Sequence, residues 1–521
     1  MGIPSYFSYI IRTYSNIIRK DCERVQLLMM DCNSIIYDSY RQLQLEYEKT
    51  PFDISAIEDR LIQMTIHKIC EYIQFISPEK LAYITFDGVA PIAKMEQQRT
   101  RRYKSNKQRK DTEIWNTTNI TPGTPFMIKL SARINTYFTP LRMSNAQNNR
   151  SNPFISAPFG GILNENWCKT QYKSKIKIIT SCSDEPGEGE HKLFQYIRDT
   201  DCKDDIIAVY GLDADLIMLS IFHTQFVRNI YVFRETPNFK TVLSSEYSAG
   251  QCVFMDINAL FNCIFKEMGN YDPLYKKIRV NDYIFMCFLL GNDFLPHFPS
   301  INIRIHGIQI LMDTYYQTIG KYNDRSLIDP ITKNIAWNYV KIFLTALSKN
   351  EHSNMKRETS DRDKWDNRKW PIKTEDDIDQ LNLNSPMIYR MDEKYICPSQ
   401  PGWETRYYKR LFEIDPNKET IEKISINYLE GLEWVYKYYT TGCASWKWKY
   451  NYHYPPLLID LVKYIPTGKK DFIEDLLSKP VSVETQLKYI MNWNCKGIRC
   501  AYSRYMWESH PILQHIDINM I

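Results

Sequence analysis

Two stretches, IKIITSCSDEPGEGE at 176–190 and IIAVYGLDAD at 206–215, decide the fold of this chain. Each begins with a short, mostly apolar run and passes directly into acidic residues. Short apolar runs bounded by polar turns are typical of the buried strands of a parallel sheet. The helix-like segment at 190–197 lies between the two runs and predicts the crossover that parallel strands require.

The same pattern occurs twice nearer the N-terminus. Residues 25–30 (VQLLMM) lead into Asp31, and residues 81–86 (LAYITF) lead into Asp87. A helical segment at 59–75 separates these two runs. Strands that alternate with helices in this way predict an α/β fold, in which helices flank a mostly parallel sheet.

The rest of the chain divides into three parts. Residues 1–348 are expected to form the α/β core, within which 144–167, rich in Asn, Ser, Gly and Pro, is typical of a long surface loop. Residues 349–403 are highly charged and indicate a linker or an exposed insertion. Residues 404–521 carry a strong helical pattern at 421–439 and an aromatic-rich segment to 454, so we expect a mainly helical second region that packs on the core.

The composition excludes several classes of protein. The 521 residues are 44% hydrophobic, which is enough for large cores, yet no window reaches the ~18 consecutive apolar residues of a membrane span. The N-terminus resembles no signal peptide, and Tyr6 stands where a myristoylation motif needs Ser or Thr. The 13 scattered cysteines form no CxxC pair, which indicates reduced thiols. We expect a soluble monomer in the cytoplasm, with a nuclear location left open.

Carboxylates follow every predicted strand. They are Asp31, Asp87, Glu188, Glu190, Asp213 and Asp215, and a fifth apolar segment at 283–290 is followed closely by Asp293. Because the carboxyl ends of parallel strands line one crevice, we expect these acids to converge. A single acid at a strand end is equally well explained as a helix cap, but seven acids together repel one another unless cations neutralise them. Hard oxygen ligands in this number favour two Mg²⁺ or Mn²⁺ ions and phosphodiester chemistry.

Two other chemistries of strand-end carboxylates fit this pattern less well. A phosphatase with an aspartyl nucleophile would carry a second Asp two residues after Asp31, where Asn33 stands. A sugar transferase could use Asp213 and Asp215, but it would leave the other carboxylates without a role.

Basic residues concentrate shortly after Asp87. Residues 94–110 hold eight basic residues against Glu96 alone, a local charge of +7 in a chain of net charge +5. The segment 89–103 predicts a helix with Pro91 in its first turn. One face of this helix, at positions i, i+4, i+7 and i+8, then carries Lys94, Gln98, Arg101 and Arg102. That face suits a terminal phosphate, while a solvated helix face or a localisation signal would also explain the charge.

A phosphate pocket beside a metal cluster predicts directionality. An enzyme that grips a terminal phosphate one nucleotide away from its metals removes nucleotides from that end, so the pattern favours an exonuclease over an endonuclease.

Several motifs resemble those of the XRN family of 5′-to-3′ exoribonucleases. They are MGIPSYF at 1–7, DCNSIIYD at 31–38, FDGVAPIAKMEQQRTRRY at 86–103, ITPGTPF at 120–126, DEPGEGEHK at 184–192, YGLDADLIML at 210–219, GNDFLPH at 291–297 and EGLEWVYKYYTTGCASWKWKYNYHYPP at 430–456. The resemblance covers most of the chain. It implies a nuclease core of the PIN and flap-nuclease type, in a compact member that lacks the long C-terminal extension of larger relatives.

The resemblance also implies roles for individual residues. The seven acids would be catalytic and would bind magnesium. The 5′-phosphate pocket would consist of Lys94, Gln98, Arg101 and Arg102. The first base would lie between Tyr37 and either Trp446 or Trp448, the other tryptophan belonging to the core. Stacking of this kind tolerates any base.

Three positions depart from the pattern that the resemblance implies. Tyr37 stands where the family usually has His, so its ring can stack but cannot become cationic. Ser34 stands where Gly is expected, and Ile92 where Arg is expected, which removes one contact near the phosphate. All seven acids are present, which argues against an inactive descendant.

The predicted activity is processive degradation of single-stranded RNA from a 5′-monophosphate end to nucleoside 5′-monophosphates. A cap or a triphosphate should be excluded, because the pocket is sized for one phosphate. Two rivals remain open. A structure-specific flap nuclease acting on DNA would release short oligomers, and a non-catalytic RNA-binding protein would release no product.

Overall fold

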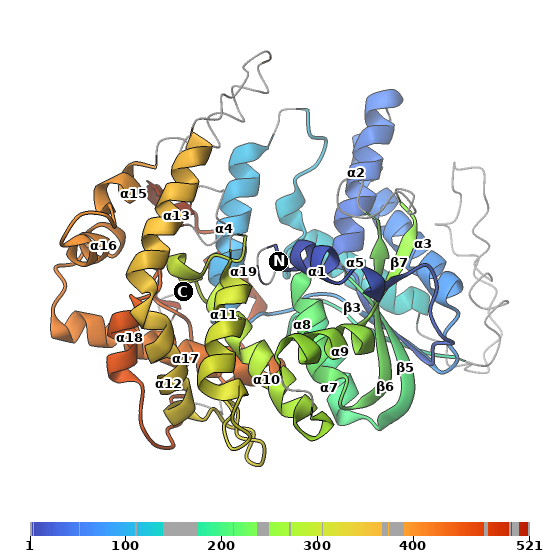
Figure 1. The fold of residues 1–521 in the computed structure, drawn as a ribbon. Helices are drawn as coiled ribbons and strands as arrows, with labels where there is room; N and C mark the ends of the chain where they lie inside the picture. Colours follow the sequence, from blue (N-terminus) through green and yellow to red (C-terminus); the bar gives the residue numbers. More distant parts are fainter. Residues whose placement is uncertain are drawn as a thin grey trace, which may run out of the picture.

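The computed structural model describes residues 3, 5–51, 53–109, 112–138, 176–211, 213–236, 250–269, 272–304, 306–366, 374, 390–473, 478–499, 502 and 510–518. The surface loop predicted at 144–167 lies outside these residues. Figure 1 shows an α/β part built on one twisted sheet and, beside it, a part made mainly of helices.

Within the described residues, seven strands form one mostly parallel sheet in the order β1-β7-β6-β5-β2-β3-β4. Their bounds are β1 (Ile18–Arg19), β2 (Leu27–Asp31), β3 (Leu81–Thr85), β4 (Lys177–Ser181), β5 (Cys202–Tyr210), β6 (Val227–Glu235) and β7 (Cys252–Asp256). The neighbours from β6 to β4 pair in parallel, and β7 is antiparallel to both β6 and β1. The four predicted strands correspond to β2, β3, β4 and β5, and the predicted α/β fold is confirmed.

Helices cover both faces of the sheet. The helices of the α/β part are α1 (Tyr6–Thr13), α2 (Asn33–Lys49), α3 (Ile57–Ile76), α4 (Ile92–Gln108), α5 (Pro125–Phe138), α7 (Gly189–Asp199), α8 (Ala214–His223), α9 (Ile257–Glu267) and α10 (Lys276–Cys287). Leu27 and Met29 of β2 pack in one hydrophobic cluster with α7, α8 and α9, whereas Leu28 and Met30 pack in a second cluster with α2, α3 and α5. Successive side chains of a strand point to opposite faces, so a strand covered on both faces must be apolar throughout.

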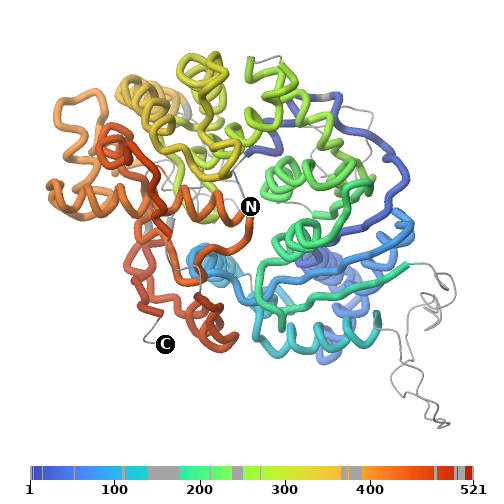
Figure 2. The backbone as a smooth tube through the Cα atoms, turned by 90° about the horizontal axis from the view of Figure 1, so that it is seen from below, coloured from blue at the N-terminus to red at the C-terminus, as the bar shows by residue number. Residues whose placement is uncertain are grey.

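The second region is mainly helical. It contains α11 (Gly307–Tyr315), α12 (Trp337–Lys349), α13 (Glu351–Asp366), α15 (Met391–Ile396), α16 (Trp403–Leu411), α17 (Lys418–Thr440), α18 (Leu458–Tyr464) and α19 (Val483–Ile490), with a hairpin of β8 (Cys495–Arg499) and β9 (His510–Leu513). The helix predicted at 421–439 is α17, which Asn417 caps by accepting a hydrogen bond from the Thr420 N–H. Figure 2 shows these yellow-to-red segments packed beside the blue and green α/β part.

Two predicted segments differ in detail from the structure. The apolar run at 283–290, which we grouped with the strand ends, forms the end of α10 and a 3₁₀ turn over Phe288–Leu290. All its residues are buried, so it lacks the periodicity that separates a helix from a strand. The first part of the segment predicted as a linker is α13, whose Met355 packs with Trp403 and Tyr407. Residues 367–373 and 375–389 lie outside the described residues.

None of the described helices is both long enough and apolar enough to cross a lipid bilayer.

Candidate active site

The sheet topology brings the predicted acids to one place. The chain passes from β2 to β3 and β4 on one side, then crosses back to place β5 against the other edge of β2. Such a reversal of strand order opens a crevice at the carboxyl ends of the strands. Asp31 ends β2, Asp87 follows β3 and Asp213 follows β5, so all three lie at this crevice.

Helix starts supply three more acids. Glu188 is at the N-cap position of α7, Glu190 lies in the first turn of α7, and Asp215 lies in the first turn of α8. Asp293 reaches the same place from the turn after α10, not from a strand.

The electrostatics show how closely the acids approach one another. Burial, followed by the negative charges of Asp87 and Asp213, raises the pKa of Asp31 well above its ordinary value. Burial and the charge of Asp215 do the same for the pKa of Glu190. Burial and the charge of Asp293 raise the pKa of Asp215 to about 6. The structure therefore brings all seven predicted acids into one cluster of mutually repelling charges.

Lys94, the first residue of the predicted phosphate face, lies inside this acid cluster. Its Nζ is 2.5 Å from Oε2 of Glu188 and 2.7 Å from Oδ2 of Asp293, and the side chain is buried. Burial lowers the pKa of Lys94, but the charges of Asp293 and Glu188 outweigh burial and raise it well above its ordinary value. The cationic face of α4 and the acid cluster are therefore in direct contact.

The other predicted phosphate residues divide into two groups. Gln98 is buried, and its Oε1 has no hydrogen-bond partner in the described part of the chain. Burial raises the pKa of Asp293, but the charges of Lys94 and Arg101 hold it well below its ordinary value, so the Arg101 guanidinium lies near this acid. Arg102 instead turns to the neighbouring loop, where its Nε donates to Oγ1 of Thr121 and its Nη2 to the carbonyl of Ile120.

The two candidate tryptophans have different surroundings. The Trp448 ring stacks on Trp434 at 5.3 Å between centroids, and its Nε1 donates to Glu430 over 3.1 Å. Trp446 is half-buried, and its carbonyl accepts a hydrogen bond from the N–H of Ile92, the first residue of α4. Tyr37 lies half-buried on α2, and no contact described for these residues joins it to Trp446. The half-buried Trp448 ring thus packs against the hydrophobic core, and Trp446 lies beside the start of α4.

Sequence reasoning missed several groups that hold the acids in place. The Tyr438 hydroxyl donates to Glu188 and the Tyr439 hydroxyl to Asp215, both from α17. The N–H of Gly189 donates to Oδ1 of Asp87 over 2.7 Å. A Cβ on Gly189 would lie 2.6 Å from Oδ1 of Asp31, so this close approach requires glycine. The helical period of α17 showed which of its residues are buried, but not which acids they would meet.

The acids fit a hard divalent cation by their chemistry. Oδ1 of Asp31 is buried and has no hydrogen-bond partner among the described residues. Burial and the charges of neighbouring acids raise the pKa values of Asp31 and Glu190, and a cation bound beside them would favour their ionised forms. Carboxylate oxygens in this number are the ligands that Mg²⁺ and Mn²⁺ prefer. No three His, Cys, Asp or Glu side chains of the described chain are already arranged around an ion position. Two of the acids, Glu188 and Asp293, bind the Lys94 ammonium instead.

Comparisons with known proteins identify a family and several relatives. Residues 1–236 match the family described as XRN 5′-3′ exonuclease N-terminus, and residues 276–400 and 395–487 match the Xrn1 helical domain. The 5′-3′ exoribonuclease 2 homolog of Drosophila melanogaster is 26% identical over 591 residues, covering 89% of this chain and 61% of the fly protein. Human 5′-3′ exoribonuclease 1 is 25% identical and covers 99% of this chain, which spans 32% of the human protein.

The 5′-3′ exoribonuclease 1 of Saccharomyces cerevisiae is 24% identical and covers 98% of this chain, which spans 40% of the yeast protein. The chain thus spans between about a third and three-fifths of the length of these relatives. The family matches cover residues 1–236 and 276–487, which include α17, the seven acids and the motifs that carried the resemblance. The chain therefore belongs to the XRN family of 5′-3′ exoribonucleases.

Proposed function

We propose that this protein is a metal-dependent 5′-to-3′ exoribonuclease that hydrolyses single-stranded RNA from a 5′-monophosphate end. The contact between Lys94 and the acid cluster carries the proposal, because it sets the phosphate-binding face of α4 directly against the catalytic acids. The matching relatives are themselves named 5′-3′ exoribonucleases, which supports the same direction of attack.

In this proposal the seven acids hold two Mg²⁺ or Mn²⁺ ions. Such ions, when bound, lower the pKa of an attacking water and stabilise the departing 3′-oxygen. Asp31 and Asp213 would contribute from the crevice between β2 and β5, and Glu190 and Asp215 from the two helix starts. Ions bound there would relieve the repulsion among these acids, which would let an RNA phosphate approach the cluster.

The phosphate pocket would act through Lys94, Gln98 and Arg101. Among the described residues the amide oxygen of Gln98 has no hydrogen-bond partner. Arg101, like Lys94, lies close enough to Asp293 for its charge to lower the pKa of that acid. We give Arg102 a supporting role, because two of its nitrogens already hold the loop at 120–121. A pocket anchored next to the acids would place the first internucleotide linkage at the metals, and each cleavage would leave a new 5′-phosphate for the same pocket. Repeated cleavage without release would make the enzyme processive.

Trp446 is the better candidate for stacking on the first base. The Trp446 backbone contacts Ile92, the first residue of α4, whereas the ring of Trp448 is already stacked on Trp434. Tyr37, from α2, would cover the other face of the base.

The most direct test compares RNAs of one sequence that carry a 5′-monophosphate, a 5′-hydroxyl, a 5′-triphosphate or a cap. With Mg²⁺ present, we expect rapid loss of the monophosphate RNA to mononucleotides and little loss of the others. Asp213→Ala should abolish this loss while RNA binding persists. Comparable decay of capped and monophosphorylated RNA would refute the pocket, and short oligomers released from flapped DNA would favour the flap-nuclease alternative.

A further inference from the structure

Two neighbouring tyrosines at the end of α17 reach the acid cluster from the helical region. The Tyr438 hydroxyl donates to Oε1 of Glu188 over 2.8 Å, and the Tyr439 hydroxyl donates to Oδ1 of Asp215 over 2.6 Å. The two acids belong to different helices, α7 and α8. The last turn of α17 therefore contacts acids at the starts of both α7 and α8.

In three of the acids, a hydrogen bond from the protein holds one carboxylate oxygen and leaves the other oxygen for a different contact. In Asp215 the Tyr439 hydroxyl holds Oδ1, and in Asp87 the backbone of Gly189 holds Oδ1. In Glu188 the Tyr438 hydroxyl holds Oε1, while Oε2 meets the Lys94 ammonium. Carboxylates that bind a metal through one oxygen are commonly oriented by a protein donor on the other.

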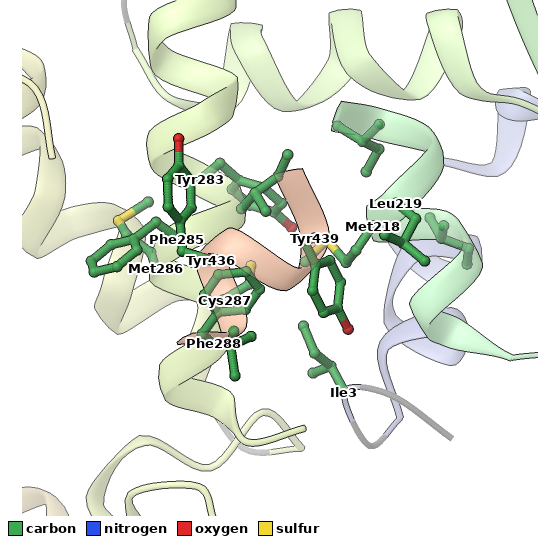
Figure 3. Close-up of a cluster of buried hydrophobic side chains, with 14 of the residues drawn as sticks. Ile3, Met218, Leu219, Tyr283, Phe285, Met286, Cys287, Phe288, Tyr436 and Tyr439 are labelled. Carbon is green, nitrogen blue, oxygen red and sulfur yellow. The ribbon is translucent and has the colours of Figure 1, made fainter. Parts of the chain in front are cut away.

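The rings of both tyrosines are fixed by packing. Tyr438 stacks on His191 at 3.6 Å between centroids and on Trp434 at 4.6 Å. Tyr439 packs against Phe288 at 5.2 Å, within the buried cluster shown in Figure 3. Because the rings cannot swing, each hydroxyl has a defined position, and the carboxylate oxygen that it holds is defined as well.

We propose that Tyr438 and Tyr439 are positioning residues that set the affinity of the acid cluster for divalent cations. The inference rests on the proposed function, since it concerns the same metal site. It adds that the helical region completes this site, because neither hydroxyl comes from the α/β core.

A purely structural role is the alternative, in which the hydroxyls only satisfy buried polar atoms. The two roles predict different measurements. A structural hydroxyl changes the free energy of unfolding but leaves cation affinity alone, whereas a positioning hydroxyl changes cation affinity in a protein that is still folded.

The experiment uses the full chain and Mn²⁺ as the probe. Free Mn²⁺ is followed by electron paramagnetic resonance during titration of the wild type, Tyr438→Phe, Tyr439→Phe and the control Tyr436→Phe. Tyr436 is a buried tyrosine of the same helix that packs against Phe285 and touches no acid of the cluster in the described contacts. Phenylalanine keeps the ring packing, so the variants should keep a cooperative unfolding transition.

We expect the first two variants to bind Mn²⁺ roughly 10- to 100-fold more weakly and the control to bind as the wild type does. The Mg²⁺ concentration for half-maximal RNA hydrolysis should rise in parallel, and excess Mg²⁺ should restore most of the rate. Asp215→Ala provides a second measurement, because it removes the acceptor carboxylate in place of the donor hydroxyl. If Tyr439 acts through Asp215, adding Tyr439→Phe to that variant should weaken Mn²⁺ binding little further.

The outcomes separate the inference from the proposed function. Wild-type Mn²⁺ affinity in both Phe variants would overturn the positioning role and leave the exonuclease proposal standing. Additive losses in the double variant would likewise overturn it for Tyr439. A wild-type protein that binds no divalent cation would instead refute the metal site on which both depend.

Discussion

Trp446 and Trp448 stand two residues apart but contact different parts of the protein. Trp448 stacks on Trp434 and lies against Gly431, where a Cβ would be 2.9 Å from its ring. Trp446 lies half-buried beside the first residue of α4. The sequence motif alone left the choice between them open, because alternate residues of an irregular segment carry no period that tells core from surface.

We therefore predict opposite effects for the two alanine variants. Trp446→Ala should lower kcat/KM for 5′-monophosphate RNA on the order of 10-fold or more, since stacking on an aromatic contributes about 1–3 kcal/mol per base. Its melting temperature should stay near that of the wild type. Trp448→Ala should lower the melting temperature, because it leaves a cavity against Trp434. Steady-state kinetics and thermal unfolding of both variants test this, and a reversed pattern would assign the stacking role to Trp448.

Glu351 gives a pH dependence that lies away from the acid cluster. Its carboxylate accepts hydrogen bonds from the N–H groups of Leu458 and Ile459, at the start of α18. Burial raises the pKa of Glu351 from 4.5 to about 7. The folded state thus keeps a proton that the unfolded chain releases above pH 4.5. The stability from this group is fully present below pH 4.5 and is lost as the pH rises through 7.

Glu351→Gln removes this titration. We expect the melting temperature of the wild type to fall between pH 5 and pH 8, and that of Glu351→Gln to fall less over the same range. At pH 5 the variant should be less stable, because its single amide oxygen replaces two acceptors. Thermal unfolding at four pH values tests this, with the exposed Glu419→Gln as the control. Parallel pH profiles for Glu351→Gln and the wild type would contradict the assignment.

The candidate site was only partly predictable at the residue scale. The acids were recognised because each follows an apolar strand or segment, which places chemistry at known ends of a sheet. The position of Lys94 inside the cluster depends on how α4 approaches α7, and no spacing along the chain encodes that distance. The turn of Arg102 toward Thr121 has the same cause, since the loop that receives it folds back on α4.

Among the elements, α4 depends on α19 for its position. The Tyr489 hydroxyl donates to Glu96, whose carboxylate also meets the Lys449 ammonium at 3.2 Å. Arg99 is buried, donates to the carbonyl of Asn492 and lies over the Tyr489 ring. The N–H of Ala90, just before α4, donates to the buried Gln486 side chain over 2.7 Å. These contacts lie on the face of α4 away from the acids, so α19 fixes the orientation of the phosphate face.

Tyr489→Phe should loosen α4 without touching the acids. We expect KM for 5′-monophosphate RNA to rise roughly 10-fold, as for the loss of a buried hydrogen bond to a charged group, with kcat little changed. Hydrolysis of 5′-hydroxyl RNA should change little, because that substrate has no terminal phosphate for α4 to hold. Kinetics with both RNAs test this, and Glu484→Gln on the exposed side of α19 is the control. An equal effect on both RNAs would show that α19 acts on general stability.

The type of an element was predictable where polar residues bounded a short apolar run or where polar residues recurred along one face of a helix. The runs that became β2 to β5 are short and end in polar residues, and α17 shows a helical period over its length. The run at 283–290 is bounded by polar residues as a strand would be, but α10 is enclosed by α8, α9 and α17, so no exposed face revealed that it is helical. The strands β6 and β7 were not identified from the sequence. The structure shows that β7 pairs antiparallel with β6 toward one edge of the sheet.

At the scale of the whole molecule, the α/β part and the helical region both contribute groups to the acid cluster. Asp31, Asp87 and Asp213 come from the sheet, Asp293 follows α10, and α17 donates two hydrogen bonds to the cluster. Repulsion within the cluster therefore destabilises the folded arrangement of both regions, and a cation bound there would stabilise both.

Asp31→Asn separates this repulsion from cation binding. Burial, followed by the charges of Asp87 and Asp213, raises the pKa of Asp31, so its ionised form costs stability at neutral pH when no cation is bound. We expect Asp31→Asn to melt at a higher temperature than the wild type in EDTA. A Mg²⁺ concentration of about 100 times its Kd should raise the melting temperature of the wild type by about 3 °C, and that of the variant by much less. Thermal unfolding with and without Mg²⁺ measures both effects, and the exposed Glu48→Gln should behave as the wild type. A variant that is less stable in EDTA and responds fully to Mg²⁺ would show that Asp31 neither repels its neighbours nor binds the ion.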